Sequence, residues 1–116
     1  MSRSKQKGTA AETEVVRYLK NFCNLEVMRN PPQGQNDKGD IYVGGLPLVI
    51  EVKNCARMEL SEWLKEAAAE RNNASADVGV VWHKKRGKSS AEDWFVTMSG
   101  ADFMVFLSYM REHFGR

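Results

Sequence analysis

The segment that most constrains the fold is residues 46–53, with the sequence LPLVIEVK. Its apolar residues are almost continuous, a pattern that predicts a central strand covered on both faces of a sheet. Glu51 and Lys53 interrupt the run where core side chains are expected. Because side chains alternate along a strand, the side chains of these two residues point from one face of the sheet, and those of Ile50 and Val52 are expected to pack into the core on the other face.

A partner strand is predicted immediately before this one. Residues 40–43 are followed by a pair of glycines at 44–45, and glycine tolerates the positive φ of a tight hairpin turn. If the two strands pair antiparallel through that turn, Asp40 lies opposite Val49, on the face that carries Glu51 and Lys53. Two carboxylates and one ammonium then converge on one face of the sheet.

Periodicity predicts the remaining elements and the fold class. The loop at residues 30–39 (NPPQGQNDKG) contains two prolines and two glycines and is expected to be mobile. The order is α-β-β-β-α-β-β-α, which predicts an α/β protein with a small mixed central sheet flanked by helices. We expect helices at residues 8–23, 58–72 and from 99 onward, and strands at 25–29, 40–43, 46–53, 78–82 and 94–98, the last two forming a hairpin.

Two serines are candidate helix caps. Ser61 is expected to cap the start of the second helix, and Ser99 the start of the last one. The last helix has an apolar face at helical spacing, which is expected to pack. This face consists of Phe103, Phe106, Leu107 and Met110.

Length and composition predict one domain. A chain of 116 residues that is 42% hydrophobic suffices for one core, so residues 1–116 are expected to form a single domain with residues 1–7 as a flexible basic arm. No apolar run approaches the roughly 18 residues of a membrane span. Cys23 and Cys55 lack the spacing of a zinc or redox motif and are expected to be buried or half-buried. An intracellular, cytoplasmic location is the resulting expectation.

The cluster of Asp40, Glu51 and Lys53 suggests metal chemistry. Neighbouring carboxylates repel one another unless a hard divalent ion or the lysine neutralises them, and Mg²⁺ prefers such oxygen ligands. Bound Mg²⁺ suits phosphodiester hydrolysis, in which Lys53 could hold or deprotonate the water or offset developing charge. The alternative is that Asp40 is a turn residue and that Glu51 and Lys53 form an exposed ion pair on an edge strand.

These residues also resemble a known family. Gly39-Asp40 followed by Glu51-Val52-Lys53 resembles the motif of the PD-(D/E)XK nuclease superfamily. The opening at residues 7–12 (KGTAAE) is similar to the start of archaeal-type Holliday junction resolvases within that superfamily, which makes Glu12 the match to a first-helix glutamate of their metal site. Arg29 stands where those resolvases have an arginine before a flexible loop.

The resemblance implies a restriction-endonuclease-like fold and a specific site. It implies Mg²⁺, with Mn²⁺ as a substitute, held by Asp40, Glu51 and the Val52 carbonyl and joined by Glu12, with Lys53 as the catalytic lysine. It also implies a homodimer that cuts two strands of a branched DNA, which would serve recombination or replication. The sequence departs from the pattern of the family in two places. Gly39 replaces the proline of the motif, and the segment from residue 82 onward does not follow the resolvases.

Glu14 competes with Glu12 for the first-helix position. The two residues are about 200° apart around a helix. Since Ala11 and Val15 mark the buried face, Glu12 is expected to border that face and Glu14 to point further toward solvent. We therefore assign the site residue to Glu12.

Basic residues flank the proposed site and are candidate DNA contacts. A run in the tip of the last hairpin could reach along a DNA backbone, and the N-terminal arm could order on DNA, although both could equally be solvated surface. Arg29 borders the loop beside the proposed metal site. The candidate DNA-binding residues are Lys7, Arg29, Lys84, Lys85, Arg86 and Lys88.

Three functions remain open from the sequence. The first is an endonuclease on branched DNA in a bacterium or a phage-infected host cell, as the resemblance implies. The second keeps the chemistry but acts on another DNA substrate, as a repair or restriction-type nuclease does. The third is a protein that binds DNA structures without cutting them, against which the intact Asp40, Glu51 and Lys53 set argues.

Overall fold

Five strands form one mixed sheet in the computed structural model, which describes residues 3–22 and 24–115. The spatial order is β1-β2-β3-β4-β5, with β3 and β4 parallel and the other neighbouring pairs antiparallel. β3 is therefore central, as its apolar sequence predicts. The strands are β1 Val27–Arg29, β2 Ile41–Val43, β3 Leu48–Lys53, β4 Val78–His83 and β5 Phe95–Thr97.

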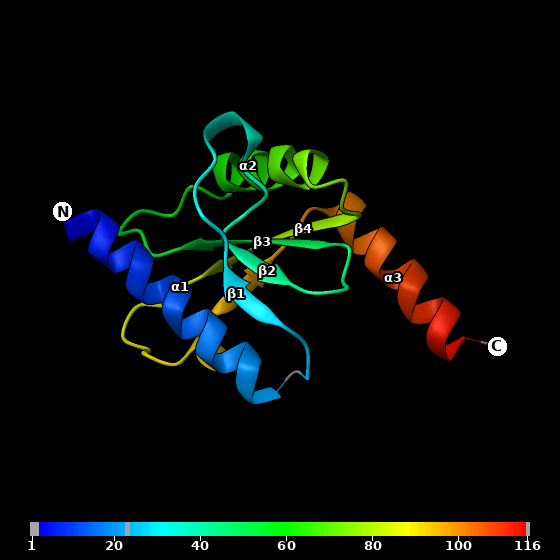
Figure 1. The fold of residues 1–116 in the computed structure, drawn as a ribbon, viewed down its shortest axis with the longest axis horizontal. Helices are drawn as coiled ribbons and strands as arrows, with labels where there is room; N and C mark the ends of the chain where they lie inside the picture. Colours follow the sequence, from blue (N-terminus) through cyan, green and yellow to red (C-terminus); the bar gives the residue numbers. More distant parts are fainter. Residues whose placement is uncertain (1–2, 23, 116) are drawn as a thin grey trace.

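Helices flank the sheet on both faces (Figure 1). α1 (Arg3–Phe22) packs on β1 and β3, and α2 (Leu60–Asn73) crosses the opposite face to connect the parallel strands β3 and β4. α3 (Gly100–Phe114) follows β5 and contacts β4. Two short 3₁₀ helices, η1 (Gly34–Asn36) and η2 (Ala91–Asp93), lie in the connections. This arrangement confirms the predicted α/β class and element order.

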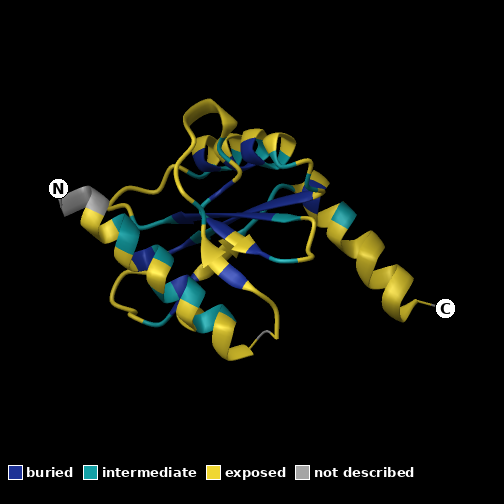
Figure 2. Cartoon of the chain, viewed as in Figure 1, coloured by how far each residue is buried: buried dark blue, intermediate teal, exposed yellow. Residues whose placement is uncertain are grey.

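The core has a layer on each face of the sheet (Figure 2). On the α1 face, Ile50 and Val52 of β3 pack with Ala11 and Val15 in the larger cluster. On the α2 face, a smaller cluster joins Val81 of β4 to Trp63 and Ala67. β3 consequently directs Leu48, Ile50 and Val52 toward α1, and Val49, Glu51 and Lys53 toward α2.

The register of the β2–β3 hairpin differs from the prediction by two positions. Ile41 pairs with Ile50, which brings Asp40 beside Glu51 instead of Val49. The turn itself closes as expected, since the Leu46 N–H donates to the Val43 carbonyl at 3.3 Å and Gly45 has a φ of 80°. Pro47 then has no N–H for the ladder, so pairing resumes at Leu48. A shift of two residues keeps every side chain on its predicted face.

Other details of the sequence interpretation need correction. α1 begins at Arg3 and not at Gly8, so residues 3–7, expected as part of a flexible arm, are helical. Lysine, arginine and glutamine are good helix formers, which explains this extension. Ser61 lies inside α2, whose N-cap is Glu59, and provides no cap. Cys55 is exposed because it lies in the loop after β3, and Cys23 is outside the described residues.

α3 is the least covered of the three α-helices among the described residues. Ser99 caps it as predicted, with its Oγ accepting from the Asp102 N–H at 3.0 Å. The apolar face expected to pack is instead 39–46% exposed at Phe103, Phe106, Leu107 and Met110. The helix meets the sheet near its first turn and then projects away from it (Figure 1). Among the described residues, no helix is both long and apolar enough to cross a membrane.

Candidate active site

Asp40 stands at the entry to β2 and is held by two backbone contacts. Its N–H donates to the Ile50 carbonyl at 2.8 Å, and its Oδ2 accepts from the Val52 N–H at 2.7 Å. The preceding Gly39 has a φ of 91°, and a Cβ there would lie 2.7 Å from Val49 Cγ1. Proline, with its φ fixed near −65°, cannot take this conformation. Glycine therefore fits the position at which the superfamily motif has proline.

Glu51 and Lys53 meet on the α2 face of the central strand. Glu51 is 7% exposed, and its Oε2 lies 3.3 Å from Lys53 Nζ. The ammonium also lies 2.8 Å from Oε2 of Glu66 on α2. Since Glu51 is buried in a central strand, the alternative of an exposed ion pair on an edge strand is wrong.

Two glutamates of α2 join this cluster and were missed from the sequence. Glu51, Glu66 and Glu70 each contribute one carboxylate oxygen to a group. The three oxygens all lie within 4.8 Å of one another. Glu70 is 5% exposed, and both of its oxygens lack a hydrogen-bond partner among the described residues, as does Oε1 of Glu51. A sequence signal existed, because Glu66 and Glu70 are four residues apart and so share one face of the helix.

The acids of the cluster shift one another's ionisation. Burial raises the pKa of Glu51, and the neighbouring Asp40 raises it further. Burial likewise raises the pKa values of Asp40 and Glu70. The pKa of Lys53 is raised as well: burial acts to lower it, but the hydrogen bond to Glu66 and the charge of Glu51 outweigh that effect. Ionisation of all these acids would place more negative charge in the site than one ammonium balances, and a bound cation would offset that charge.

Glu12 approaches the same site from α1. Its carboxylate pairs with Arg29, whose Nε lies 3.1 Å from Glu12 Oε1. Burial raises the pKa of Glu12, and the charge of Asp40 raises it further. Glu12 is therefore close enough to Asp40 for their charges to interact, as expected for a member of one metal site. Arg29, proposed as a DNA contact, is engaged with an acid of the site.

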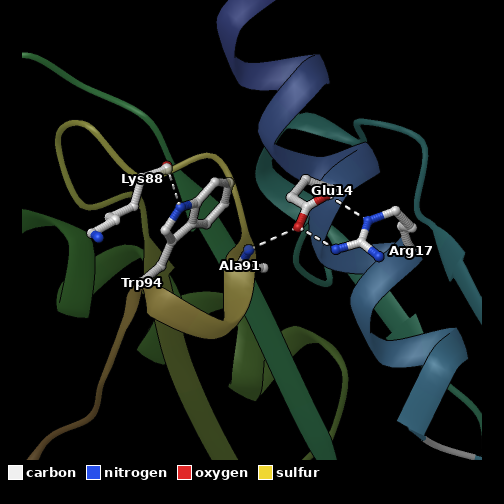
Figure 3. Close-up of polar contacts among 5 residues, drawn as sticks. All are labelled: Glu14, Arg17, Lys88, Ala91 and Trp94. Carbon is white, nitrogen blue, oxygen red and sulfur yellow. Dashed lines mark hydrogen bonds and ion pairs between the residues drawn. The ribbon is translucent and has the colours of Figure 1, made fainter.

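Glu14 has a structural role, and its predicted solvent exposure is wrong. Its side chain is 17% exposed, almost the same as the 18% of Glu12. Figure 3 shows its carboxylate between the Arg17 guanidinium and the backbone N–H of Ala91, both at 2.7 Å. The loop that carries η2 covers this part of α1, which the helix periodicity could not reveal.

The loop at residues 30–39 is tied to the rest of the site. Asn73, the last residue of α2, donates from Nδ2 to the carbonyls of Gln35 and Asp37 at 2.8 and 2.9 Å. The Asp37 carboxylate accepts from the Gly39 N–H at 3.1 Å. Its charge also acts on Asp40 and raises the pKa of that carboxyl. Asp37 is thus a further acid of the site that the sequence interpretation did not identify.

A hollow of about 490 Å³ adjoins Lys53 and has a basic border. Trp63, His83 and Phe95 contribute its aromatic walls. Two of the candidate DNA contacts lie elsewhere: Arg29 pairs with Glu12, and Lys88 uses its carbonyl to accept from Trp94 Nε1 at 2.8 Å (Figure 3). The basic residues that line the hollow are Lys7, Lys53, Lys84, Lys85 and Arg86.

Comparison with known proteins agrees with this geometry. Residues 3–114 match the family described as "phage putative PDDEXK endonuclease". No curated protein and no solved structure matches the chain significantly. The match covers nearly the whole chain and includes every acid and base of the candidate site. The resemblance to the PD-(D/E)XK superfamily is confirmed, whereas the narrower resemblance to Holliday junction resolvases stays a prediction. The chain therefore belongs to this phage family of PD-(D/E)XK endonucleases.

Proposed function

We propose that this chain is a divalent-metal-dependent endodeoxyribonuclease that hydrolyses phosphodiester bonds in branched DNA. The observation that carries the proposal is the convergence of Asp40, Glu51 and Lys53, where Lys53 also lines a hollow with a basic border. The acidic side suits a hard cation, and the basic side suits DNA phosphate. Membership of an endonuclease family supports the same chemistry.

The proposed ligands of the cation are Asp40, Glu51 and the Val52 carbonyl, with Glu12 nearby. The donor set fits Mg²⁺, because every donor is oxygen and Oε1 of Glu51 is buried without a partner among the described residues. We expect Mn²⁺ to substitute. When bound, such a cation would polarise a phosphate and lower the pKa of a coordinated water.

We propose that Lys53 acts as a charge stabiliser. Its ammonium lies within 3.3 Å of Glu51 and 2.8 Å of Glu66, and two neighbouring carboxylates favour the charged form of the lysine. A charged ammonium offsets negative charge on a phosphate in the transition state and cannot accept a proton from water. Of the roles left open by the sequence, this one agrees best with the contacts.

The proposed DNA path follows the basic hollow. Lys7 comes from α1, and Lys84, Lys85 and Arg86 come from the loop between β4 and β5, so two separate elements would hold one backbone. The loop is braced, because Trp82 Nε1 donates to the Ala91 carbonyl at 3.2 Å and Trp94 Nε1 to that of Lys88. We keep Lys88 and Arg29 as weaker candidates for DNA contact.

We further propose that the protein acts as a homodimer through α3. Seven apolar side chains of α3 are 39–67% exposed, and a groove of about 810 Å³ lies between this helix and the α1 face of the sheet. Side chains of this size expose on the order of 100 Å² each when half covered, so the helix offers roughly 700 Å², close to the ~800 Å² per partner of a stable interface. The side chains are Phe103, Met104, Phe106, Leu107, Tyr109, Met110 and Phe114.

A second copy would place two cutting sites on one particle, which suits a substrate with two strands to cut. This fit and the similarity of residues 7–12 to resolvases support branched DNA as the substrate and recombination as the process. The phage family supports a location inside a bacterial or phage-infected cell.

The test is cleavage by the purified full chain. We expect cutting of a synthetic four-way junction with Mg²⁺ or Mn²⁺, and none with a chelator. Asp40→Asn and Lys53→Ala should each lower the cleavage rate by about 10²-fold or more, because the first removes a proposed ligand of the cation and the second removes the positive charge that stabilises the transition state. Binding of the junction, measured by gel shift, should persist in both variants.

Two surface residues of α2 provide matched controls. Glu62 and Lys65 form an exposed ion pair at 3.5 Å, so Glu62→Gln and Lys65→Ala should cut at the wild-type rate. Forks, linear duplex and single strands complete the substrate set. If linear duplex is cut as fast as the four-way junction, the proposed branched substrate is wrong and a repair or restriction-type nuclease is the better assignment. Binding without cutting in either metal would replace the nuclease by a DNA-structure-binding protein.

A further inference from the structure

The carboxylate of Glu70 is buried without a compensating contact. The residue is 5% exposed, and among the described residues neither Oε1 nor Oε2 has a hydrogen-bond partner. Buried polar groups in folded proteins are almost always paired, and a buried charge requires a counter-charge or a metal. A side chain that violates this rule within an active site points to a missing ligand.

A second carboxylate of the cluster also has an unpaired oxygen. Oε1 of Glu51 is also buried without a partner among the described residues, and Glu66 completes a group whose ligand atoms all lie within 4.8 Å. Three oxygens at such spacing can surround one divalent cation, since Ca²⁺, Mg²⁺ and Mn²⁺ bind oxygen ligands at about 2.0–2.6 Å.

Lys53 does not neutralise these particular oxygens. Its ammonium contacts Oε2 of Glu51 and Oε2 of Glu66, which leaves Oε1 of Glu51 and the whole carboxylate of Glu70 without a positive partner. Lys53 therefore leaves oxygens of Glu51 and Glu70 available to a cation.

We infer that Glu70 of α2 is a ligand of a divalent cation, which it binds together with Glu51 and Glu66 between β3 and α2. This site extends the acids proposed above, Asp40 and Glu51, onto the helix that crosses the sheet. The assignment of the cation to DNA cleavage rests on the proposed function, but the binding of the cation does not.

The test measures Mn²⁺ binding in the absence of DNA. Full-length protein is stripped with a chelator and titrated with Mn²⁺ by calorimetry at pH 7.5, and melting curves are recorded with and without the metal. We expect Glu70→Gln to weaken Mn²⁺ binding by at least about tenfold, because a neutral amide replaces a charged ligand. The rise in Tm that Mn²⁺ gives the wild type should shrink accordingly.

Glu62→Gln is the matched control. It makes the same chemical change on the same helix, at a side chain that is 63% exposed and pairs with Lys65. Its Mn²⁺ affinity should equal that of the wild type. If Glu70→Gln does not fold, Glu70→Asp provides the test, since a shorter carboxylate should still bind Mn²⁺ but more weakly than the wild type.

Each outcome decides the inference. Wild-type affinity in Glu70→Gln, or in Glu70→Asp where that variant is needed, would overturn it, and so would a wild-type protein that binds no Mn²⁺ without DNA. Loss of Mn²⁺ binding in the variant would support it even if the wild type cuts no DNA, in which case the proposed function alone would fail. If the wild type cuts DNA with a metal but the Glu70 variant binds Mn²⁺ as tightly as the wild type, the inference is wrong and the proposed function stands.

Discussion

At the scale of single residues, Glu14 shows how a charged side chain next to an active site can serve the fold instead. Its carboxylate binds the Arg17 guanidinium and the Ala91 N–H, which attaches α1 to the loop carrying η2 (Figure 3). The hydrogen bond to Arg17 lowers the pKa of Glu14 below its ordinary value of 4.5. The carboxylate form is thus the stabilising one.

We predict that Glu14→Ala lowers the free energy of unfolding at pH 7 by about 1–2 kcal/mol, the usual worth of charge-assisted hydrogen bonds. Because the folded-state pKa is lowered, this contribution is complete above pH 4.5 and disappears as pH falls through the folded value. Urea unfolding of both proteins between pH 3 and 7 measures the difference. A difference that stays constant down to pH 3 would show that the charge of Glu14 contributes nothing.

The sequence identified the candidate site residues of the two strands and of α1, but not those of α2 and the loop. Asp40, Glu51 and Lys53 have a recognisable spacing, and the alternation of a strand puts their side chains on one face. Glu70 and Asp37 come close only when α2 crosses the sheet and Asn73 binds the loop. The spacing of Glu66 and Glu70 puts them on one face of α2, but one sequence does not show which strand that face meets.

At the scale of elements, the contact between α2 and β4 depends on a glycine. A Cβ at Gly79 would lie 2.8 Å from the Ala67 carbonyl oxygen and 3.3 Å from the Ala67 carbonyl carbon, which are backbone atoms of α2. The helix can therefore approach the strand closely because Gly79 has no side chain.

We predict that Gly79→Ala lowers the free energy of unfolding by about 1–3 kcal/mol, the usual cost of overpacking. Gly8→Ala is the control and should instead raise the free energy of unfolding. A Cβ at Gly8 meets nothing within 4 Å, and alanine favours a helix over glycine by about 1 kcal/mol. Thermal melting of the two variants measures both effects, and a neutral Gly79→Ala would contradict the close packing.

Element order was predictable, whereas register and boundaries were not. Apolar runs and helical spacing are properties of single segments, and they indicate where strands and helices lie. Register depends on how two segments meet: Pro47 delays pairing after the turn and moves Asp40 from Val49 to Glu51. The sequence did not indicate where α1 begins, because the basic residues at its start are equally compatible with a flexible tail and with a helix.

At the scale of the whole molecule, α3 is the element whose sequence and surroundings disagree. It is apolar around most of its circumference, a pattern typical of buried helices, yet its side chains remain exposed (Figure 2). The amino-acid sequence could not reveal this. An apolar periodicity predicts that a helix face is covered, but it does not identify what covers that face. The proposed second copy resolves the disagreement.

We predict a mass of twice 13.1 kDa by light scattering at tens of micromolar protein. Phe106→Lys should remain a folded single chain, because it puts a charge on the exposed apolar face of α3. Ala69→Lys is the control, at an exposed position of α2 on the opposite side of the sheet, and should leave the dimer unchanged. A wild type that stays a single chain at these concentrations would rule out the dimer.

The central position of β3 also bears on how the molecule opens. This strand is bonded to a neighbour on each side, so its amide hydrogens exchange with solvent only when the sheet itself separates. Beyond its first turn, where Asp102 binds Arg71 of α2 and the Gly79 N–H, α3 has mostly exposed side chains and is expected to fray before the sheet opens. Glu51 and Lys53 therefore belong to the part of the protein that opens last, and partial unfolding would release the association surface while the acids stayed in place.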